Sequence, residues 1–434
     1  MTAQFSTIKV SVQNNSIPKR DYWTAGALVF NPRANMIGFT YDPEYCGPPI
    51  DPVNMNYKQT GIRTFLFSAD KPLPKIIRRF LPTDTQRKAL KQDMSYLDIN
   101  DDYKMLQYLG HNERNGFLLS ANQLVFTDGK HECYALDNVD LTSKLGRDLR
   151  LFADSLDRTR MPDENEIYKV RPTYGDKRIN IALLSGEGDE WLAKIPSADA
   201  GYNSARIEHL TLSVLNKAGF DVPRSRLHED KEGNLLLLVE RFDVKNKVRQ
   251  HTITLDDLFE VGASSSYNHF SRVLRLSSSN FNQDKDRLAQ SIVIDSIFNV
   301  TDNHGANFSL ISNKEGYLLS PLYDKIPNPA KDIFSTRLGT SRLNFMDTQA
   351  INQLHTATGV PVSLLSHYAQ SLYRAIQRYL PQLALEQHIP ENEWSAITSA
   401  IEVNQPQLAK KLPKKLTQVT FDNTCPSLSD VPSP

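Results

Sequence analysis

Short apolar runs separated by turns dominate the first 160 residues. Segments such as TIKVSV and ALVFN alternate apolar and polar positions, and turn-rich pieces such as DPEYCGPPIDPVN lie between them. This pattern predicts short strands joined by loops. Two stretches, KPLPKIIRRFLPT and DDYKMLQYLG, are instead helical in pattern, and in the second one Met105, Leu106 and Leu109 share a face.

The pattern changes after Tyr168. NIALLS and EWLAKIP are strand-like runs joined by the turn segment GEGD, which predicts a hairpin. In ARIEHLTLSVLNKAGF the apolar positions follow the period of an amphipathic helix that ends near Gly219 and Pro223. NLLLLVERFD then predicts a buried strand, so the expected order is strand, strand, helix, strand.

Helical patterns dominate the second half of the chain, as in DKDRLAQSIVIDSIFNV and VSLLSHYAQSLYRAIQRYL. The last stretch, TFDNTCPSLSDVPSP, has little to bury and predicts a disordered tail. We therefore expect an N-terminal α/β subdomain over 1–160, a sheet-containing lobe over 161–250, a helical lobe over 251–420 and a tail over 421–434.

Composition narrows the classes of function. The 434 residues are enough for two or three domains with a cleft between them. Lys plus Arg and Asp plus Glu number 50 each, which argues against a protein that coats nucleic acid or anionic membrane through bulk charge. The three scattered cysteines favour a reducing compartment, and no apolar run has transmembrane length. We expect a soluble, cytoplasmic protein without a membrane partner.

The stretch TDNHGANFSL gathers short polar side chains directly after an apolar helical pattern. Asp302 follows the helix, Asn307 comes five residues later, and a predicted hairpin, FSLIS-NKEG-YLLSPLYD, returns Asp324 toward its start. Phosphoryl transfer needs an Asp that orients the acceptor hydroxyl, together with an Asn and an Asp that hold Mg²⁺. The order Asp, Asn, Asp is that of protein kinases, although H-R-D and D-F-G are absent. The alternative is an Asx-type turn at a helix end.

A second pair of residues lies upstream. Lys194 is inside the apolar strand LAKIP, and Glu208 follows at the start of the next helix. A strand Lys paired with a helix Glu is how kinases hold the α and β phosphates. The alternative is an edge-strand Lys whose amine reaches water. The two sets of residues together favour a kinase.

These segments also resemble a known family. EWLAKIPS, IEHLTLSVLNKAGFDVPRSRL, LVERFD, TDNHGANFSL and LSPLYD are similar, in the same order, to the core motifs of the HipA family of bacterial toxin Ser/Thr kinases. YDPEYCGPPIDP, FSADKPLPKIIRRFL and MLQYLGHNERNGFLL resemble the N-terminal subdomain of that family. The resemblance implies an α+β, bilobal protein-kinase-like fold, with a mixed α/β N-terminal lobe, an extra N-terminal subdomain and a mainly helical C-terminal lobe.

The resemblance implies a role for each matched residue. Asp302 is the expected catalytic base, and Asn307 and Asp324 are the expected Mg²⁺ ligands. The residues expected to contact ATP are Gly175, Lys177, Lys194, Glu240, Phe242, His304 and Asn307. Of these, Glu240 and Phe242 would form the hinge that takes the adenine. Phe242 could equally be a core residue, and His304 a hydrogen-bonded turn residue.

The segment before the first kinase strand departs from the family. The family has a Ser that is autophosphorylated, followed by a phosphate loop with Gly and Lys. Here the segment is VRPTYGDKRINIALL, with Pro172 where the Ser is expected and Thr173 beside it as the candidate autophosphorylation site. Only Gly175 keeps its place, and Lys177 supplies a cation at a shifted position. This departure predicts altered nucleotide affinity.

The resemblance also implies partners. The chain is expected to be an ATP- and Mg²⁺-dependent toxin kinase that arrests growth by phosphorylating a translation-related protein substrate, with aminoacyl-tRNA synthetases as the family's targets. A small helix-turn-helix antitoxin is the expected partner, and operator DNA would be contacted through that complex. The candidate basic groups for DNA contact are Arg337 with Arg342, and Lys410, Lys411, Lys414 and Lys415.

Two other functions remain open from the sequence. One is a catalytically weakened kinase-like binding module in an antitoxin–DNA repressor complex, which the altered phosphate loop favours. The other is a small-molecule phosphotransferase, which shares the acidic residues. The presence of Asp302, Asn307, Asp324 and Lys194 together argues against the first, and the N-terminal subdomain argues against the second.

Overall fold

The computed structural model describes most of the chain. The described residues are 7–13, 22–31, 33–68, 73–81, 98, 100–109, 111–114, 117–120, 134–135, 180–184, 190–194, 203–229, 235–245, 248–258, 266–329 and 348–416. The expected phosphate loop around Gly175 and the expected tail at 421–434 lie outside them. Within the described residues, no helix combines the length and the apolar character that crossing a membrane requires.

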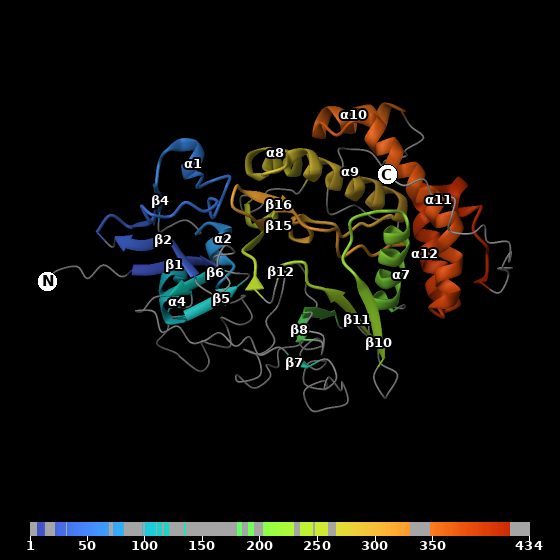
Figure 1. Cartoon of the computed structure of the whole chain (residues 1–434), viewed down its shortest axis with the longest axis horizontal. Helices are drawn as coiled ribbons and strands as arrows, with labels where there is room; N and C mark the ends of the chain where they lie inside the picture. The colour runs from blue at the N-terminus through green and yellow to red at the C-terminus, as the bar shows by residue number, and fades with distance from the viewer. Residues whose placement is uncertain are drawn as a thin grey trace.

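An antiparallel six-stranded sheet forms the N-terminal subdomain, at the blue and cyan end of Figure 1. Its order is β4-β3-β2-β1-β6-β5. The strands are β1 (Thr7–Gln13), β2 (Tyr22–Asn31), β3 (Met36–Tyr41), β4 (Thr64–Ser68), β5 (His111–Arg114) and β6 (Phe117–Ser120). The helices are α1 (Tyr57–Thr60), α2 (Lys75–Arg78) and α4 (Asp102–Leu109). The predicted short strands and both predicted helical stretches are thus confirmed.

A second sheet, in the order β10-β11-β9-β8-β7, carries α7 (Ser204–Lys217) against it. Its strands are β7 (Tyr134–Ala135), β8 (Asn180–Leu184), β9 (Glu190–Lys194), β10 (Ser225–Glu229) and β11 (Leu235–Glu240). The predicted hairpin is the antiparallel β8–β9 pair, and the predicted buried strand is β11. The predicted strand order was incomplete, because β10 lies between α7 and β11. Its pattern is half-exposed and therefore gives no strong apolar signal.

Helices dominate the rest of the chain, from the yellow α8 and α9 to the orange and red α10, α11 and α12 in Figure 1. They are α8 (Tyr267–Ser277), α9 (Phe281–Phe298), α10 (Thr348–Thr358), α11 (Val362–Glu386), α12 (Glu391–Asn404) and α13 (Pro406–Ala409). The 25 residues of α11 pack against α7 and α9. This arrangement confirms an α+β fold with N-terminal sheets and a mainly helical C-terminal part.

A small sheet, β14-β15-β16, lies within the helical part. Its strands are β14 (Thr252–Thr254), β15 (Ser309–Ser312) and β16 (Tyr317–Leu319), and the two-stranded ribbon β12 (Val244–Lys245) and β13 (Val248–Arg249) precedes it. The predicted hairpin after Asn307 is β15–β16. The sequence did not predict β14, which pairs with β15 across more than 50 residues of chain.

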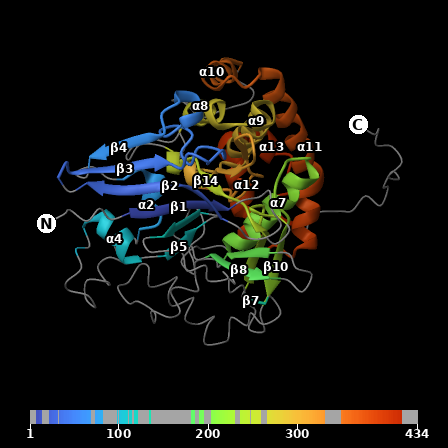
Figure 2. The same ribbon diagram turned by 60° about the vertical axis from the view of Figure 1, so that its left-hand side comes forward.

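The N-terminal subdomain docks on this small sheet (Figure 2). The Tyr317 hydroxyl of β16 donates to the Pro49 carbonyl, 2.8 Å away. Arg79, the C-cap residue of α2, forms an ion pair of 3.2 Å with Asp257 and also donates to the Thr252 carbonyl. The subdomain is therefore anchored beside the strands that position the candidate site.

Candidate active site

The first candidate residue, Asp302, follows the end of α9. This helix is buried along its last three turns and ends at Phe298, where Asn299 adopts a left-handed conformation as the C-cap with a φ of 53°. The chain then turns, and Asp302 is exposed whereas its neighbour Asn303 is buried. The buried helix α9 thus positions the exposed Asp302 carboxylate at the surface.

Asn307 closes the turn that begins at Asp302. It ends the short 3₁₀ helix η3 (Gly305–Asn307), and its Nδ2 donates to the backbone carbonyl of Asp302 at 2.9 Å. The half-buried His304 precedes this helix, and its carbonyl accepts from the Asn307 N–H. The Asn307 Oδ1 is buried and has no hydrogen-bond partner in the described part of the chain. The Asn307 Nδ2 is therefore held by a hydrogen bond, and the Oδ1 is available to bind a ligand.

A close backbone contact holds η3 in place. A Cβ on Gly305 would lie 2.9 Å from the backbone N of Asp256, so only glycine allows the approach. Asp256 begins the 3₁₀ helix η2 (Asp256–Leu258), which α2 contacts through Lys75 and Arg79. The turn that carries Asn307 is thus packed against a segment tied to the N-terminal subdomain.

The β15–β16 hairpin returns the chain to the same turn. Tyr323 donates its hydroxyl to the carbonyl of Ala306 at 3.0 Å and lies 2.8 Å from the Ser309 Oγ. Asp324 follows directly, with a φ of 56°. That left-handed conformation is uncommon for a residue with a Cβ, and such conformations concentrate at functional sites. The hairpin therefore brings Asp324 beside the turn of Asn307, as its sequence predicts.

Lys194 joins the two lobes. Its Nζ lies 2.6 Å from the Glu208 Oε1 on α7 and 2.8 Å from the Asp324 Oδ1. Burial alone would lower the pKa of this amine, but attraction to Asp324 and Glu208 outweighs burial and raises it. Lys194, only 8 % exposed, therefore stays charged at neutral pH, which excludes the alternative of an amine that reaches into water.

The two expected hinge residues lie at the end of β11. The Glu240 carboxylate pairs with Arg224, with its oxygens 2.6 Å and 2.7 Å from the guanidinium, and its N–H donates to the Arg224 carbonyl. The half-buried Phe242 ring lies 5.3 Å from the Tyr323 ring, next to Asp324. Phe242 is thus at the site rather than in the distant core, whereas the Glu240 N–H is already used within the sheet.

Several residues singled out in the sequence either lie outside the described residues or show no contact with this site in the described part of the chain. Gly175, Lys177 and Thr173 lie outside the described residues, as do Arg337 and Arg342. The remaining basic group, of exposed lysines near α13, consists of Lys410, Lys411, Lys414 and Lys415. Their exposure leaves them available for a partner, but no contact among the described residues points to one.

A buried polar cluster behind the site was not predicted from the sequence. Lys325, which is 0 % exposed, lies 3.0 Å from the Asp295 Oδ1 and 3.0 Å from the Ser291 Oγ. Burial lowers the pKa of Lys325, and the attraction of Asp295 opposes that shift. The signal available in the sequence was a single Asp within the apolar helix SIVIDSIF.

The donor set fits one Mg²⁺ ion bound together with a nucleotide. Asn307 offers its unpaired buried Oδ1, and Asp324 offers a carboxylate. The described residues contain no cluster of three His, Cys, Asp or Glu side chains that could hold a metal. Mg²⁺ commonly takes only one or two protein oxygens and completes its shell with water and phosphate, so this pair is sufficient.

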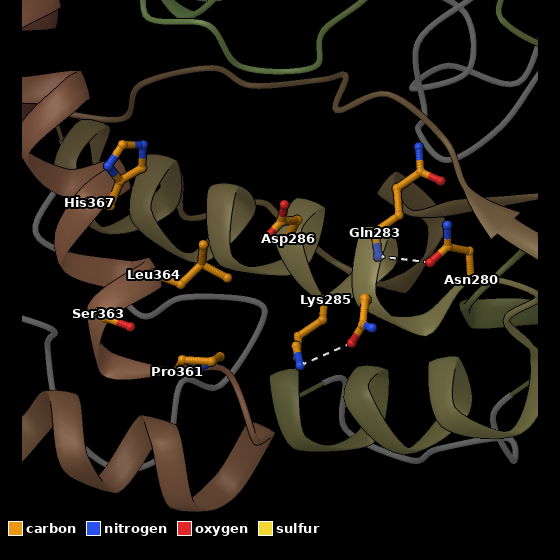
Figure 3. Close-up of a pocket in the computed structure, with 9 residues that line it drawn as sticks. Asn280, Gln283, Lys285, Asp286, Pro361, Ser363, Leu364 and His367 are labelled. Atoms are coloured by element: carbon orange, nitrogen blue, oxygen red, sulfur yellow. Dashed lines mark hydrogen bonds between the residues drawn. The ribbon is translucent and has the colours of Figure 1, made fainter. Parts of the chain in front are cut away.

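A pocket of about 560 Å³ lies elsewhere, between the starts of α9 and α11 (Figure 3). Its walls include Asp286 of α9 and His367 of α11, together with the N-cap residues of the two helices, Asn280 and Pro361. At 1.5 Å per residue, most of α9 separates it from Asp302, a distance of roughly 20 Å. None of the residues that line this pocket is a candidate site residue, so it is separate from the site.

A family model and one solved structure, that of a HipA protein, support this fold. Residues 170–380 match the family model of the HipA-like C-terminal domain. The structure matches HipA in the complex of the Shewanella oneidensis MR-1 toxin–antitoxin system HipA, HipB and its operator DNA, with a TM-score of 0.65 and 14% identity over 93% of this chain and 97% of that chain. The Helicobacter pylori proinflammatory kinase CtkA gives a TM-score of 0.31 and 14% identity over 56% of this chain and 93% of that chain. No curated protein sequence matches the chain.

Proposed function

We propose that the chain, whose residues 170–380 match the family model of the HipA-like C-terminal domain, is an ATP- and Mg²⁺-dependent Ser/Thr protein kinase. The observation that carries the proposal is the position of Lys194. Its amine is buried between the α7 carboxylate Glu208 and the post-hairpin carboxylate Asp324. An amine held between the lobes in this way is what the binding of α and β phosphates requires.

Each remaining residue has a role in this reaction. Asp302, exposed at the start of its turn, would accept the proton of the substrate hydroxyl as that oxygen attacks the γ-phosphate. Asn307 and Asp324 would hold Mg²⁺, which supplies charge neutralisation at the β and γ phosphates. Lys194 would orient the α and β phosphates, and Phe242 would form one wall for the adenine.

We further propose that this kinase is the toxin of a toxin–antitoxin pair. The Shewanella oneidensis protein with the same fold is part of a complex with HipB and operator DNA. The expected partner is accordingly a small helix-turn-helix antitoxin, with operator DNA contacted through that complex. The expected substrate is a translation-related protein, with aminoacyl-tRNA synthetases as the first group to test.

The second candidate function is a kinase-like binding module with weakened catalysis. The segment VRPTYGDKRINIALL favours it, because Tyr174 and Asp176 stand where a phosphate loop needs backbone amides. A weakened enzyme would still bind an antitoxin. The two functions therefore differ in the transfer of phosphate and not in the partner.

Phosphate transfer from radiolabelled ATP separates the two functions. Wild-type protein should label itself or a protein in lysate, and Asp302→Ala should lower that rate by about 10²- to 10⁴-fold, because a general base is lost. Binding of Mg²⁺-ATP should persist in the variant. The matched control is Glu315→Ala, which removes an exposed carboxylate from the turn of the β15–β16 hairpin and should leave the rate unchanged.

Three outcomes would contradict the kinase proposal. Equal labelling by wild type and Asp302→Ala would exclude Asp302 as the base. The absence of any labelling by wild-type protein, with ATP binding intact, would favour the binding module. Label that appears only in small molecules would favour a small-molecule phosphotransferase.

A further inference from the structure

Asp295 contacts the chain neighbours of both reactive carboxylates. On one side it accepts a hydrogen bond from the Nδ2 of Asn303, the residue after Asp302. On the other side it lies 3.0 Å from the Nζ of Lys325, the residue after Asp324. These two segments are more than 20 residues apart in the chain and meet at one carboxylate on α9.

The surroundings of Asp295 are closed and polar. Tyr267 of α8 donates its hydroxyl to Asp295, and the Asn303 Nδ2 lies 3.2 Å from that hydroxyl and 3.3 Å from the Ser291 Oγ. Lys325 also lies 3.0 Å from the same Ser291 Oγ. All five residues of this cluster are buried. We call this set the Asp295 cluster: Tyr267, Ser291, Asp295, Asn303 and Lys325.

Burial alternates along both segments in the same way. Asp302 is exposed and Asn303 is buried, and Asp324 is half-buried and Lys325 is buried. Each reactive carboxylate is thus followed by a side chain that enters the Asp295 cluster. A small rotation of the chain at Asn303 would therefore reorient Asp302, and one at Lys325 would reorient Asp324.

The helix that carries Asp295 is itself fixed. Arg287 binds the Asp221 carboxylate at 2.6 Å, and the Gln290 Oε1 accepts from the Asp221 N–H. Near its start, the Asp284 carboxylate accepts from the Leu319 N–H at 2.8 Å. The segments that carry Asp302 and Asp324 are therefore both held by the same fixed helix, α9.

Stability alone does not account for this cluster. Removing two charges from water is unfavourable, and apolar residues of similar volume are often as stabilising as a buried ion pair. A hydrogen-bonded pair has a fixed geometry that apolar packing lacks. We propose that Asp295 is a positioning residue that sets where Asp302 and Asp324 stand relative to each other, by binding Asn303 and Lys325 on one helix. This inference deepens the proposed function and rests on it.

The test is the double variant Asp295→Asn/Lys325→Met, which removes both charges together and so avoids an unpaired one. In full-length protein, amide hydrogen exchange in segments 301–308 and 323–328 should become about tenfold faster or more. The kcat for phosphate transfer should fall by about 10- to 100-fold, because the alignment of Asp302 with Asp324 is lost.

The control is Asp284→Asn, the same chemical change at the other buried carboxylate of α9. It should leave exchange in segment 301–308 unchanged. The smaller variant Asn303→Ala removes only one anchor, so it should speed exchange in 301–308 and leave 323–328 as it is. This variant decides the question even when the double variant does not fold.

Two results would overturn the inference. One is unchanged exchange in both segments of a folded double variant. The other is faster exchange across the whole described fold, which would make Asp295 a general stabilising residue. A wild-type protein that transfers no phosphate would instead contradict the proposed function, and the exchange measurements would still decide the role of Asp295.

Discussion

Two buried lysines lie on either side of Asp324 and are held in opposite ways. Lys194 contacts two carboxylates, Glu208 and Asp324, and its pKa is raised in spite of burial. Lys325 contacts one carboxylate, Asp295, and burial lowers its pKa. The Lys194 group, with Glu208 and Asp324, carries one more negative than positive charge. The Lys325–Asp295 pair has no net charge and is fully buried.

This difference in charge indicates which of the two regions is suited to binding a ligand. A divalent cation would offset the excess negative charge of the Lys194 group, and the Asn307 Oδ1 has no hydrogen-bond partner among the described residues. The Lys325–Asp295 pair has no net charge for a cation to offset, and its hydrogen bonds fix the position of the backbone instead. We infer that the Lys194 region is built for binding and the Lys325 region for geometry, so substitutions in the two should affect different measurements.

Among substitutions in the two lysine regions, the largest expected effect is on activity, from Lys194→Met. Phosphate transfer should fall by about 10²- to 10³-fold, because a charge that acts on phosphate in a water-poor site is lost. The measurement is the rate of label incorporation at saturating Mg²⁺-ATP. Lys217→Met, which removes an exposed lysine from the last turn of α7, is the control and should keep the wild-type rate. A Lys194→Met rate within a factor of two of wild type would remove the contrast between the two lysines.

Next is the effect of Lys325→Met on stability. This single change leaves Asp295 buried without its cation, so the free energy of unfolding should fall by about 3 kcal/mol. Adding Asp295→Asn should recover most of that loss, because no unpaired charge then remains. Denaturant unfolding of the two single variants and the double variant measures this non-additivity. Strictly additive losses would mean that the two side chains do not act as a pair.

Much of the Lys194 region could be predicted from the sequence. The hairpin β8–β9, the helix α7 and the hairpin β15–β16 each have a local pattern of apolar residues and turns. A lysine inside an apolar strand and a carboxylate on the next helix are themselves conspicuous. Local rules therefore placed these side chains close enough for their contact to be expected.

The Lys325 region could not be predicted in the same way. Asp295 and Lys325 are 30 residues apart, and their contact depends on how the hairpin folds back on α9. The isolated Asp in SIVIDSIF indicated a buried carboxylate without indicating its partner. The strand β14 and the docking of Pro49 on Tyr317 escaped prediction for the same reason, since both are long-range contacts.

The smallest expected effect concerns Asp51, a buried carboxylate held by N–H groups of Val53 and Asn54 rather than by a lysine. Burial raises its pKa from 3.8 to about 6, and those hydrogen bonds lower it only in part. The folded state therefore holds its proton more tightly than the unfolded state, and the associated stability is lost as pH rises through about 6. Between about pH 5 and about pH 7.5, the stability of wild type relative to Asp51→Asn should decrease by about 1–2 kcal/mol. Unfolding curves at both pH values measure it, and a pH-independent difference would show that Asp51 is ionised throughout this range.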